Sequence, residues 1–128
     1  MTLQIIDGPL FAKGESLSSG IDISAGNIVR ITTPAGWTNA NLTFQISSDG
    51  TGYNDLYDAE GQEITIVVRG DNSAIIIRDP WSRTINFIKF RSGTVKNPVP
   101  QQDGRLFAVA IEVDEPDAPA AASAGKRP

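Results

Sequence analysis

The carboxylates that could do chemistry in this chain lie close together, in and just after the stretch "SSDGTGYNDLYDAEG" at residues 47–61. They are Asp49, Asp55, Asp58, Glu60 and Glu63. Carboxylate oxygens coordinate Ca²⁺, and a pair of carboxylates can cleave a glycosidic bond. The spacing departs from the calcium-loop pattern, which has acidic or amide residues at alternate positions, then Gly and a later Glu. Catalysis by a pair needs surroundings that keep one carboxyl protonated, which a solvated loop does not supply. We therefore expect neither a metal site nor a catalytic pair here.

Turn formation is the simpler explanation for the same stretch. Asp49–Gly50 suits a tight turn that needs a positive φ or an Asx-type hydrogen bond, and Glu60–Gly61 ends a second turn. Between the two turns "YNDLYD" alternates, which predicts a short strand carrying Tyr53 and Tyr57. The carboxylates are then expected to serve turns and solubility, and the tyrosines are the better candidates for contact.

Composition removes several classes of function. The 128 residues include no Cys and no His, which excludes thiolate nucleophiles, disulfides, cysteine zinc sites, Ser–His triads and imidazole ligands. We therefore expect a protein that is not an enzyme and carries no cofactor. A net charge of −4 with eleven scattered Lys and Arg residues argues against a nucleic-acid partner. No window approaches the run of about 18 apolar residues that a membrane helix needs, and "MTLQIIDGPLFAKGES" lacks the pattern of a secretion signal.

Apolar and polar residues alternate with a period of two through most of the chain, which predicts strands. The clearest alternating segments are 20–24, 27–32, 41–47, 63–68, 73–78, 85–92 and 105–113. One or two N-terminal strands, around Leu3–Ile6 and Leu10–Lys13, bring the total to about eight or nine. No segment has a sustained helical stripe, so any helix should be a single turn. A strand with one apolar face must bury that face against a second sheet. We therefore predict an all-β, antiparallel, jelly-roll-like β-sandwich.

The chain divides into a domain and a tail. Residues 1–113 carry the strand pattern, whereas residues 114–128 read "DEPDAPAAASAGKRP" and contain no large apolar side chain. Such a segment cannot offset the entropy cost of ordering itself alone, so we predict a flexible tail. An inert terminus is the favoured interpretation, and a docking arm in an assembly stays open.

Each tryptophan directly follows turn residues, in "PAGW" and "RDPW". An exposed indole on a loop can stack on a sugar or anchor an interface, whereas a buried one closes the end of the sandwich. For Trp37, which leads straight into an alternating strand, we favour the buried position. For Trp81, which polar residues surround, both remain open. Arg83, Lys89 and Arg91 form the one local basic group, and we expect a solvated strand face there.

Several motifs follow one another in a recognisable order. They are "GWTNANLTFQISSDGTGYNDLYDAEGQEITI", then "SAIIIRDPW", then "FIKFRSG" and a final "FAVAIE" strand, within about residues 20–113. In this order they resemble a group of small proteins encoded among the structural genes of tailed phages, prophages and gene-transfer agents. The resemblance implies a component of the virion, assembled in the bacterial cytoplasm and built on a jelly-roll-like sandwich. It would be a head decoration, a head-spike or fibre-base protein, or a neck or tail accessory. The family offers no catalytic residue to carry over.

The resemblance also implies how such a protein would act. It would be a structural subunit that contacts capsid, portal, neck or fibre proteins and forms a homo-oligomer, because small virion proteins commonly gain stability by symmetric association. The residues expected to contact a partner or a glycan are Tyr53, Asp55, Tyr57, Asp58, Trp81 and Arg83. The alternative is a discoidin-like carbohydrate-binding module that recognises a cell-surface glycan through the same residues. That likeness is to architecture alone.

Overall fold

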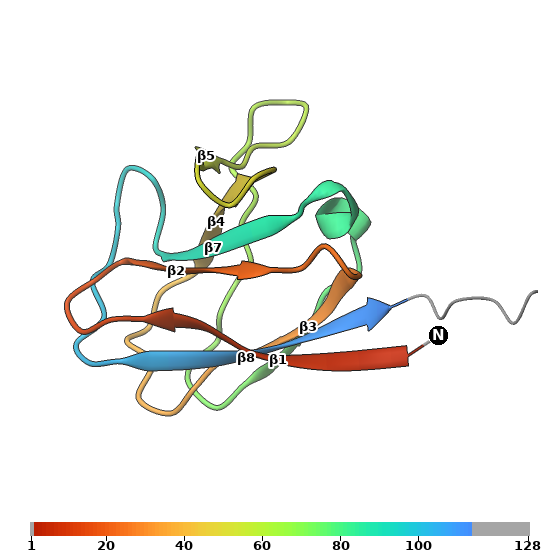
Figure 1. The fold of residues 1–128 in the computed structure, drawn as a ribbon. Helices are drawn as coiled ribbons and strands as arrows, with labels where there is room; N and C mark the ends of the chain where they lie inside the picture. The colour runs from red at the N-terminus through yellow and green to blue at the C-terminus, as the bar shows by residue number, and fades with distance from the viewer. Residues whose placement is uncertain (1, 114–128) are drawn as a thin grey trace, which may run out of the picture.

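Residues 2–113 of the computed structural model form two four-stranded antiparallel sheets that pack face to face (Figure 1). Met1 and the predicted tail, residues 114–128, lie outside the described residues. The elements are β1 (Thr2–Phe11), β2 (Leu17–Asp22), β3 (Asn27–Thr32), β4 (Leu42–Ser47), β5 (Asn54–Asp55), β6 (Ala74–Ile76), η1 (Pro80–Thr84), β7 (Phe87–Ser92) and β8 (Arg105–Val113). Within this range no helix is long and apolar enough to cross a membrane.

The winding of the chain is that of a jelly roll. We call the sheet with strand order β1-β8-β3-β6 sheet A, and the sheet with order β2-β7-β4-β5 sheet B. Successive strands alternate between the two sheets, except for β4 and β5, which are neighbours in sheet B. Eight strands in two sheets with this alternation make a double Greek key. The predicted all-β sandwich is therefore confirmed, and between residues 2 and 113 the one helical element is the 3₁₀ turn η1.

A chain of aromatic contacts runs through the core between the sheets. Ring centroids of neighbouring members lie 4.9 to 5.6 Å apart, and every pair of rings is edge-to-face or tilted. The members are Phe11, Trp37, Phe107, Phe90, Phe44 and Trp81. Trp37 is 5% exposed and its Nε1 donates a hydrogen bond of 3.2 Å to the Ala40 carbonyl, which confirms the buried position. Aliphatic side chains from both sheets surround the rings, including Ile28, Ile31, Leu42, Ile88, Val109 and Ile111.

One strand prediction is wrong in detail, and one open choice is resolved. Of the one or two strands predicted for the N-terminal region, the structure has one, β1, with an irregularity between Asp7 and Leu10. The alternating segment 63–68 forms no strand and makes isolated bridges at Glu63 and Ile66. Its alternation is real, because Val68 is buried and Val67 exposed. However, β5 already pairs with Gln45 and Ile46 on that edge of β4, which leaves Leu42 as the bridge partner of Ile66.

Two neighbouring residues on β8 allow a direct test of which face of the strand points into the core. Phe107 is 1% exposed and contacts the rings of Phe11, Trp37 and Phe90, whereas Leu106 is 52% exposed. We expect Phe107→Ala to lower the free energy of unfolding by about 3 to 5 kcal/mol. Leu106→Ala should lower it by less than about 1 kcal/mol. Urea unfolding followed by tryptophan fluorescence measures both, and equal losses would contradict the assignment of faces.

Candidate functional site

Asp49 builds the first of the two predicted turns. Its Oδ1 accepts hydrogen bonds from the backbone N–H groups of Thr51 at 2.8 Å and Gly52 at 3.1 Å, and from the Ser47 hydroxyl at 2.9 Å. Gly50 between them has a φ of 80°, which a side chain would strain. The hydrogen bonds from Thr51, Gly52 and Ser47 favour the ionised carboxylate, so they hold the pKa of Asp49 below its ordinary value. The turn interpretation of this carboxylate is confirmed.

Asp58 builds the second turn in the same way. Its Oδ1 accepts the backbone N–H groups of Glu60 and Gln62, each at 2.9 Å, and its carbonyl accepts the N–H of Gly61 at 3.1 Å. One oxygen of this predicted contact residue is thus occupied within the loop. Across residues 2–113, no group of three or more His, Cys, Asp or Glu side chains is placed to hold a metal ion.

Arg91 corrects the prediction of a solvated basic face. The residue is 7% exposed, and its guanidinium lies between two carboxylates on the outer side of sheet B. Nη2 pairs with Asp55 Oδ1, and Nη1 lies 3.3 Å from Glu63 Oε2. The sequence pattern placed Arg91 correctly on the face opposite Phe90. The pattern gave no indication that the loop after β5 folds back and covers that face.

The Arg91 ion pairs connect segments that are distant in the sequence. Arg91 Nη1 also donates to Thr43 Oγ1 at 3.3 Å, which ties the pair to β4. Asp55 Oδ1 accepts from Gln45 Nε2 at 3.1 Å, and Glu63 Oε2 accepts from the backbone N–H of Val95 at 3.1 Å. A shielded guanidinium with both carboxylates in place is compensated in charge and in hydrogen bonds. Asp55, a predicted contact residue, therefore holds the fold together at this face.

Tyr53 lies across the same face of sheet B. The Nζ of Lys89 stands 4.4 Å from the centre of its ring, a cation–π contact. Its hydroxyl reaches β2 at Gly20, where an added Cβ would come within 2.3 Å of the oxygen. Gly20 therefore makes room for Tyr53, and this tyrosine is half-buried by contacts within the chain.

The remaining predicted contact residues lie elsewhere. Tyr57, in the loop after β5, is 49% exposed. Trp81 in η1 is half-buried, with its ring 5.0 Å from that of Phe44, so it belongs to the aromatic chain while part of it faces solvent. The six predicted residues thus fall into three places: the outer face of sheet B, the loop beyond β5, and η1. They do not form one constellation.

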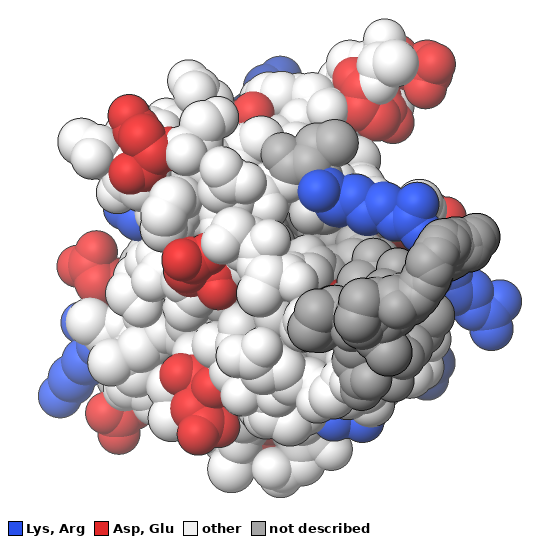
Figure 2. Space-filling view, turned by 45° about the vertical axis from the view of Figure 1, so that its right-hand side comes forward, with Lys and Arg blue, Asp and Glu red and all other residues white. Residues whose placement is uncertain are grey.

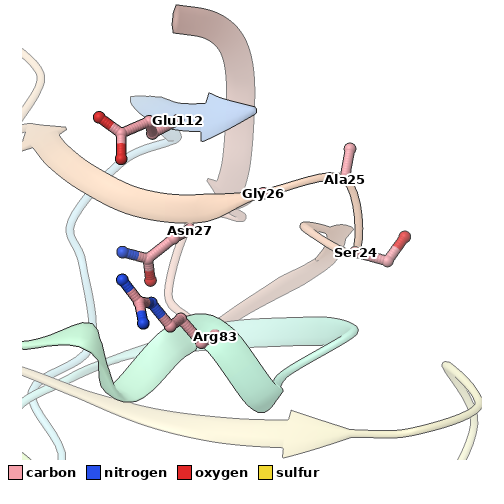
Figure 3. A pocket seen from close by; sticks show the side chains of 6 residues that line it. All are labelled: Ser24, Ala25, Gly26, Asn27, Arg83 and Glu112. Atoms are coloured by element: carbon pink, nitrogen blue, oxygen red, sulfur yellow. The ribbon is translucent and has the colours of Figure 1, made fainter. Parts of the chain in front are cut away.

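Arg83 lines an open hollow of about 440 Å³ at one end of the sandwich (Figure 3). The other lining residues are Ser24, Ala25, Gly26, Asn27 and Glu112. Figure 3 shows the Arg83 side chain extending from η1 toward Asn27, while Ser24 points away from it. The Asn27 side chain itself accepts a hydrogen bond from the buried Ser82 hydroxyl, whose oxygen accepts the N–H of Ile28 at 2.9 Å. This end of the hollow is therefore held by structural contacts.

The outer face of sheet A exposes several large apolar side chains, which the residue pattern alone did not bring together. The pairing registers place both charged and apolar residues on that face. The charged ones are Asp7, Arg30 and Glu112, and the apolar ones are Leu3, Ile5, Leu10, Ala74, Ile76, Leu106, Ala108 and Ala110. Five of them are large and exposed, from 48% at Leu10 to 66% at Ile76. Across one row of paired strands the side chains are Ile5, Ala110, Arg30 and Ile76. Antiparallel sandwiches usually keep this side of a sheet polar.

The signal for this face was present in "RLFAVAIEV". Assigning Phe107, Val109 and Ile111 to the core leaves Leu106, Ala108 and Ala110 on the opposite face, where polar residues are usual. The charged side chains on the face shown in Figure 2 stand apart among uncharged residues. That view contains no broad basic surface of the kind that binds a phosphate backbone.

No protein-family model matches this chain, and neither a curated protein nor a solved structure matches it. The resemblance to phage structural proteins and the six contact residues therefore stay predictions. What the structure adds is the fold, the contacts of each candidate side chain, and the contrast between the two outer faces.

Removing the Arg91 guanidinium tests its structural role. Arg91→Met leaves Asp55 and Glu63 without their partner in a shielded position, so we expect the free energy of unfolding to fall by about 2 to 3 kcal/mol. The control is Lys89→Met, on the same strand and face, which removes one cation–π contact and should cost about 1 kcal/mol or less. Urea unfolding gives both values. Similar losses in the two variants would mean that Arg91 is no more than a surface charge.

The Asp55 contact also predicts a dependence on pH. The hydrogen bond from Arg91, aided by Gln45 and the Arg91 charge, holds the pKa of Asp55 below its ordinary value of 3.8 against the opposing effect of burial. The unfolded chain then binds the proton more readily, so the stabilisation is complete above the unfolded-state pKa. It is lost as the pH falls through the lower folded-state pKa.

The stability difference between wild type and Asp55→Asn should therefore be largest near neutral pH and shrink below about pH 4. Urea unfolding at a series of pH values measures it. Asp22 and Asp49 also have lowered pKa values. The free energy of unfolding of wild type and of Asp55→Asn should therefore still fall somewhat in acid. A difference that stays constant with pH would contradict the role of the Asp55 carboxylate.

Proposed function

We propose that this protein is a non-enzymatic structural component of a phage or phage-like particle, and that it acts through protein–protein contacts made by the outer face of sheet A. The observation that carries the proposal is the exposure of five large apolar side chains on that one face. Large apolar side chains gathered on one exposed face are typical of interaction sites. A neighbouring subunit that covers Leu106 and Ile76 would remove them from water.

The pattern of motifs supports the particle as the setting. The Trp-led strand, the meander of two turns and the late "FIKFRSG" strand occur in the order that the phage structural proteins show. The jelly roll itself serves both capsid proteins and lectins, so it favours neither reading alone. Capsid, portal, neck or fibre subunits are the proposed partners, and the virion is the proposed location.

The carbohydrate-binding alternative depends on free aromatic ring faces, which receive sugars by stacking. Of the three aromatic candidates, Tyr57 is the most exposed. Tyr53 carries the Lys89 ammonium over its ring, and Trp81 packs against Phe44. These contacts favour a subunit whose aromatic residues support its own fold and whose sheet face contacts the partner.

The proposal is tested on particles purified by density gradient from cells that produce this protein. Mass spectrometry should find the chain at a constant ratio to the major capsid protein. Leu106→Lys, which places a charge on the outer face of sheet A, should lower that ratio at least about tenfold, since a desolvated unpaired charge costs more than about 1.4 kcal/mol. Thr51→Lys, a matched charge in the exposed turn after β4, should leave it unchanged.

Two results would contradict the proposal. One is the absence of the chain from purified particles. The other is micromolar binding of a glycan by the isolated protein that Tyr57→Ala abolishes and Leu106→Lys leaves intact, because a contact of that kind belongs to a carbohydrate-binding module.

A further inference from the structure

Strand β1 is the longest of the outermost strands among residues 2–113. The outermost strands of the two sheets are β1, β6, β2 and β5. Of these, β6 has three residues and β5 has two, and β2 is interrupted by an irregularity between Leu17 and Gly20. Strand β1 has ten residues and is itself irregular between Asp7 and Leu10, but its segment Leu3–Asp7 pairs with β8 without interruption. Proteins usually protect long edges with charges, Pro or bulges, because unpaired backbone groups recruit other strands.

The first half of β1 lacks such protection. Its segment Leu3–Asp7 reads "LQIID", with no Lys, Pro or Gly and one charged residue, at its end. The second half lies beside β2, where the N–H of Leu10 donates to Ser19 Oγ at 3.1 Å. In the first half Leu3, Gln4 and Ile5 are exposed. Figure 1 shows this end of β1 and β8 projecting beyond sheet B.

We propose that the β1 edge pairs with the β1 edge of a second copy of this chain, antiparallel and about a two-fold axis at Gln4. The axis stands perpendicular to sheet A. Because residues that lie opposite each other in an antiparallel ladder point to the same face, the residue numbers of two opposed residues must add up to an even number. With Gln4 opposite Gln4 of the second copy, Leu3 lies opposite Ile5 on the outer face, twice. Apolar cross-strand pairs of this kind stabilise an antiparallel ladder.

Charge favours this register over its neighbours. With the axis at Gln4, the two Asp7 carboxylates lie about 20 Å apart along the strands, beyond the roughly 8 Å over which salt screens exposed charges. An axis at Ile5 would place Leu3 opposite Asp7, an apolar side chain against a charge. An axis at Leu3 would shorten the paired segment and leave Ile5 at its end. The edge is therefore complementary to itself in one register.

The pairing would join two four-stranded sheets into one of eight strands. The pairing itself does not depend on the proposed function. Only its consequence does: in the dimer, the two outer faces of sheet A would form one continuous surface toward the particle. A paired edge of this length is small for an interface, so we expect dissociation constants of about 10 µM to 1 mM in isolation. On a particle, subunits held close together would pair more completely.

The first experiment measures the mass of the purified full chain by light scattering at concentrations up to about 1 mM. We expect the mass to rise from 13.7 kDa toward twice that value. Ile5→Lys puts a charge into the paired edge and should weaken dimerisation at least about tenfold. Ile76→Lys is the matched control: it is exposed on the same face but on β6, the opposite edge, and should dimerise like wild type.

Loss of the dimer in both variants would overturn the proposal, since it would indicate that two outer faces pack together. A chain that stays monomeric throughout would also overturn it, and would leave the edge to a strand of another protein. Circular dichroism and the unfolding midpoint establish that both variants are folded.

The second experiment tests the register by disulfide trapping, which is clean because the chain has no Cys. Opposed residues of an antiparallel ladder have Cα atoms about 4.5 to 5.5 Å apart, which a disulfide can span. Gln4→Cys should therefore form a covalent dimer under mild oxidation at least about tenfold faster than Thr51→Cys. Faster trapping of Leu3→Cys or Ile5→Cys than of Gln4→Cys would overturn the register.

The outcomes separate this inference from the proposed function. A dimer that forms through β1 but is absent from purified particles contradicts the function and supports the pairing. A monomer that enters particles through Leu106 contradicts the pairing and supports the function.

Discussion

The burial of a chain of aromatic rings between two sheets is the constraint on which the rest of the structure depends. Six of the seven Phe and Trp residues belong to it. Strands β1, β4, β7 and β8 each contribute one ring, so both sheets must present their inner faces to the same layer. Trp37 and Trp81 lie at its two ends and join the loops to the core. Displacing one ring would leave a cavity lined by its neighbours, because side chains of this size cannot rearrange to fill it.

The outer faces of the two sheets differ in how their side chains are covered. On sheet B the loop beyond β5 returns across the strands. Its Glu63 and Asp55 of β5 neutralise Arg91, while Tyr53 lies against Lys89 and Gly20. This face satisfies its charges within the chain. On sheet A no loop among the described residues is seen to cover the outer face, where Leu3, Ile5, Leu10, Ile76 and Leu106 stay exposed. Because of this contrast, the outer face of sheet A, and not the aromatic loop, is the surface that we propose for contact with another subunit.

The patterns that predicted the structure correctly are local ones. Alternation identified the strands from Asn27 to Thr32 and from Arg105 to Val113, and the Asp–Gly and Glu–Gly pairs identified two turns. Each depends on neighbours within a few residues, where side-chain direction follows from the backbone. The segment 63–68 alternates as a strand does but forms none, because a ladder requires a free edge on a second strand. Whether a segment forms a strand therefore depends on a free edge of a partner strand as well as on its own sequence.

The candidate site shows the same division. Residue types and their period sufficed to place Arg91 opposite the core, to exclude Cys and His chemistry, and to assign Asp49 and Asp58 to turns. They could not show that Asp55 and Glu63 meet Arg91 from 36 and 28 residues away, or that Tyr53 crosses the sheet to Gly20. Nor could they gather Leu3, Leu106 and Ile76 onto one exposed face. Those juxtapositions depend on strand order and register, which arise when distant segments compete for the same edges and the same core.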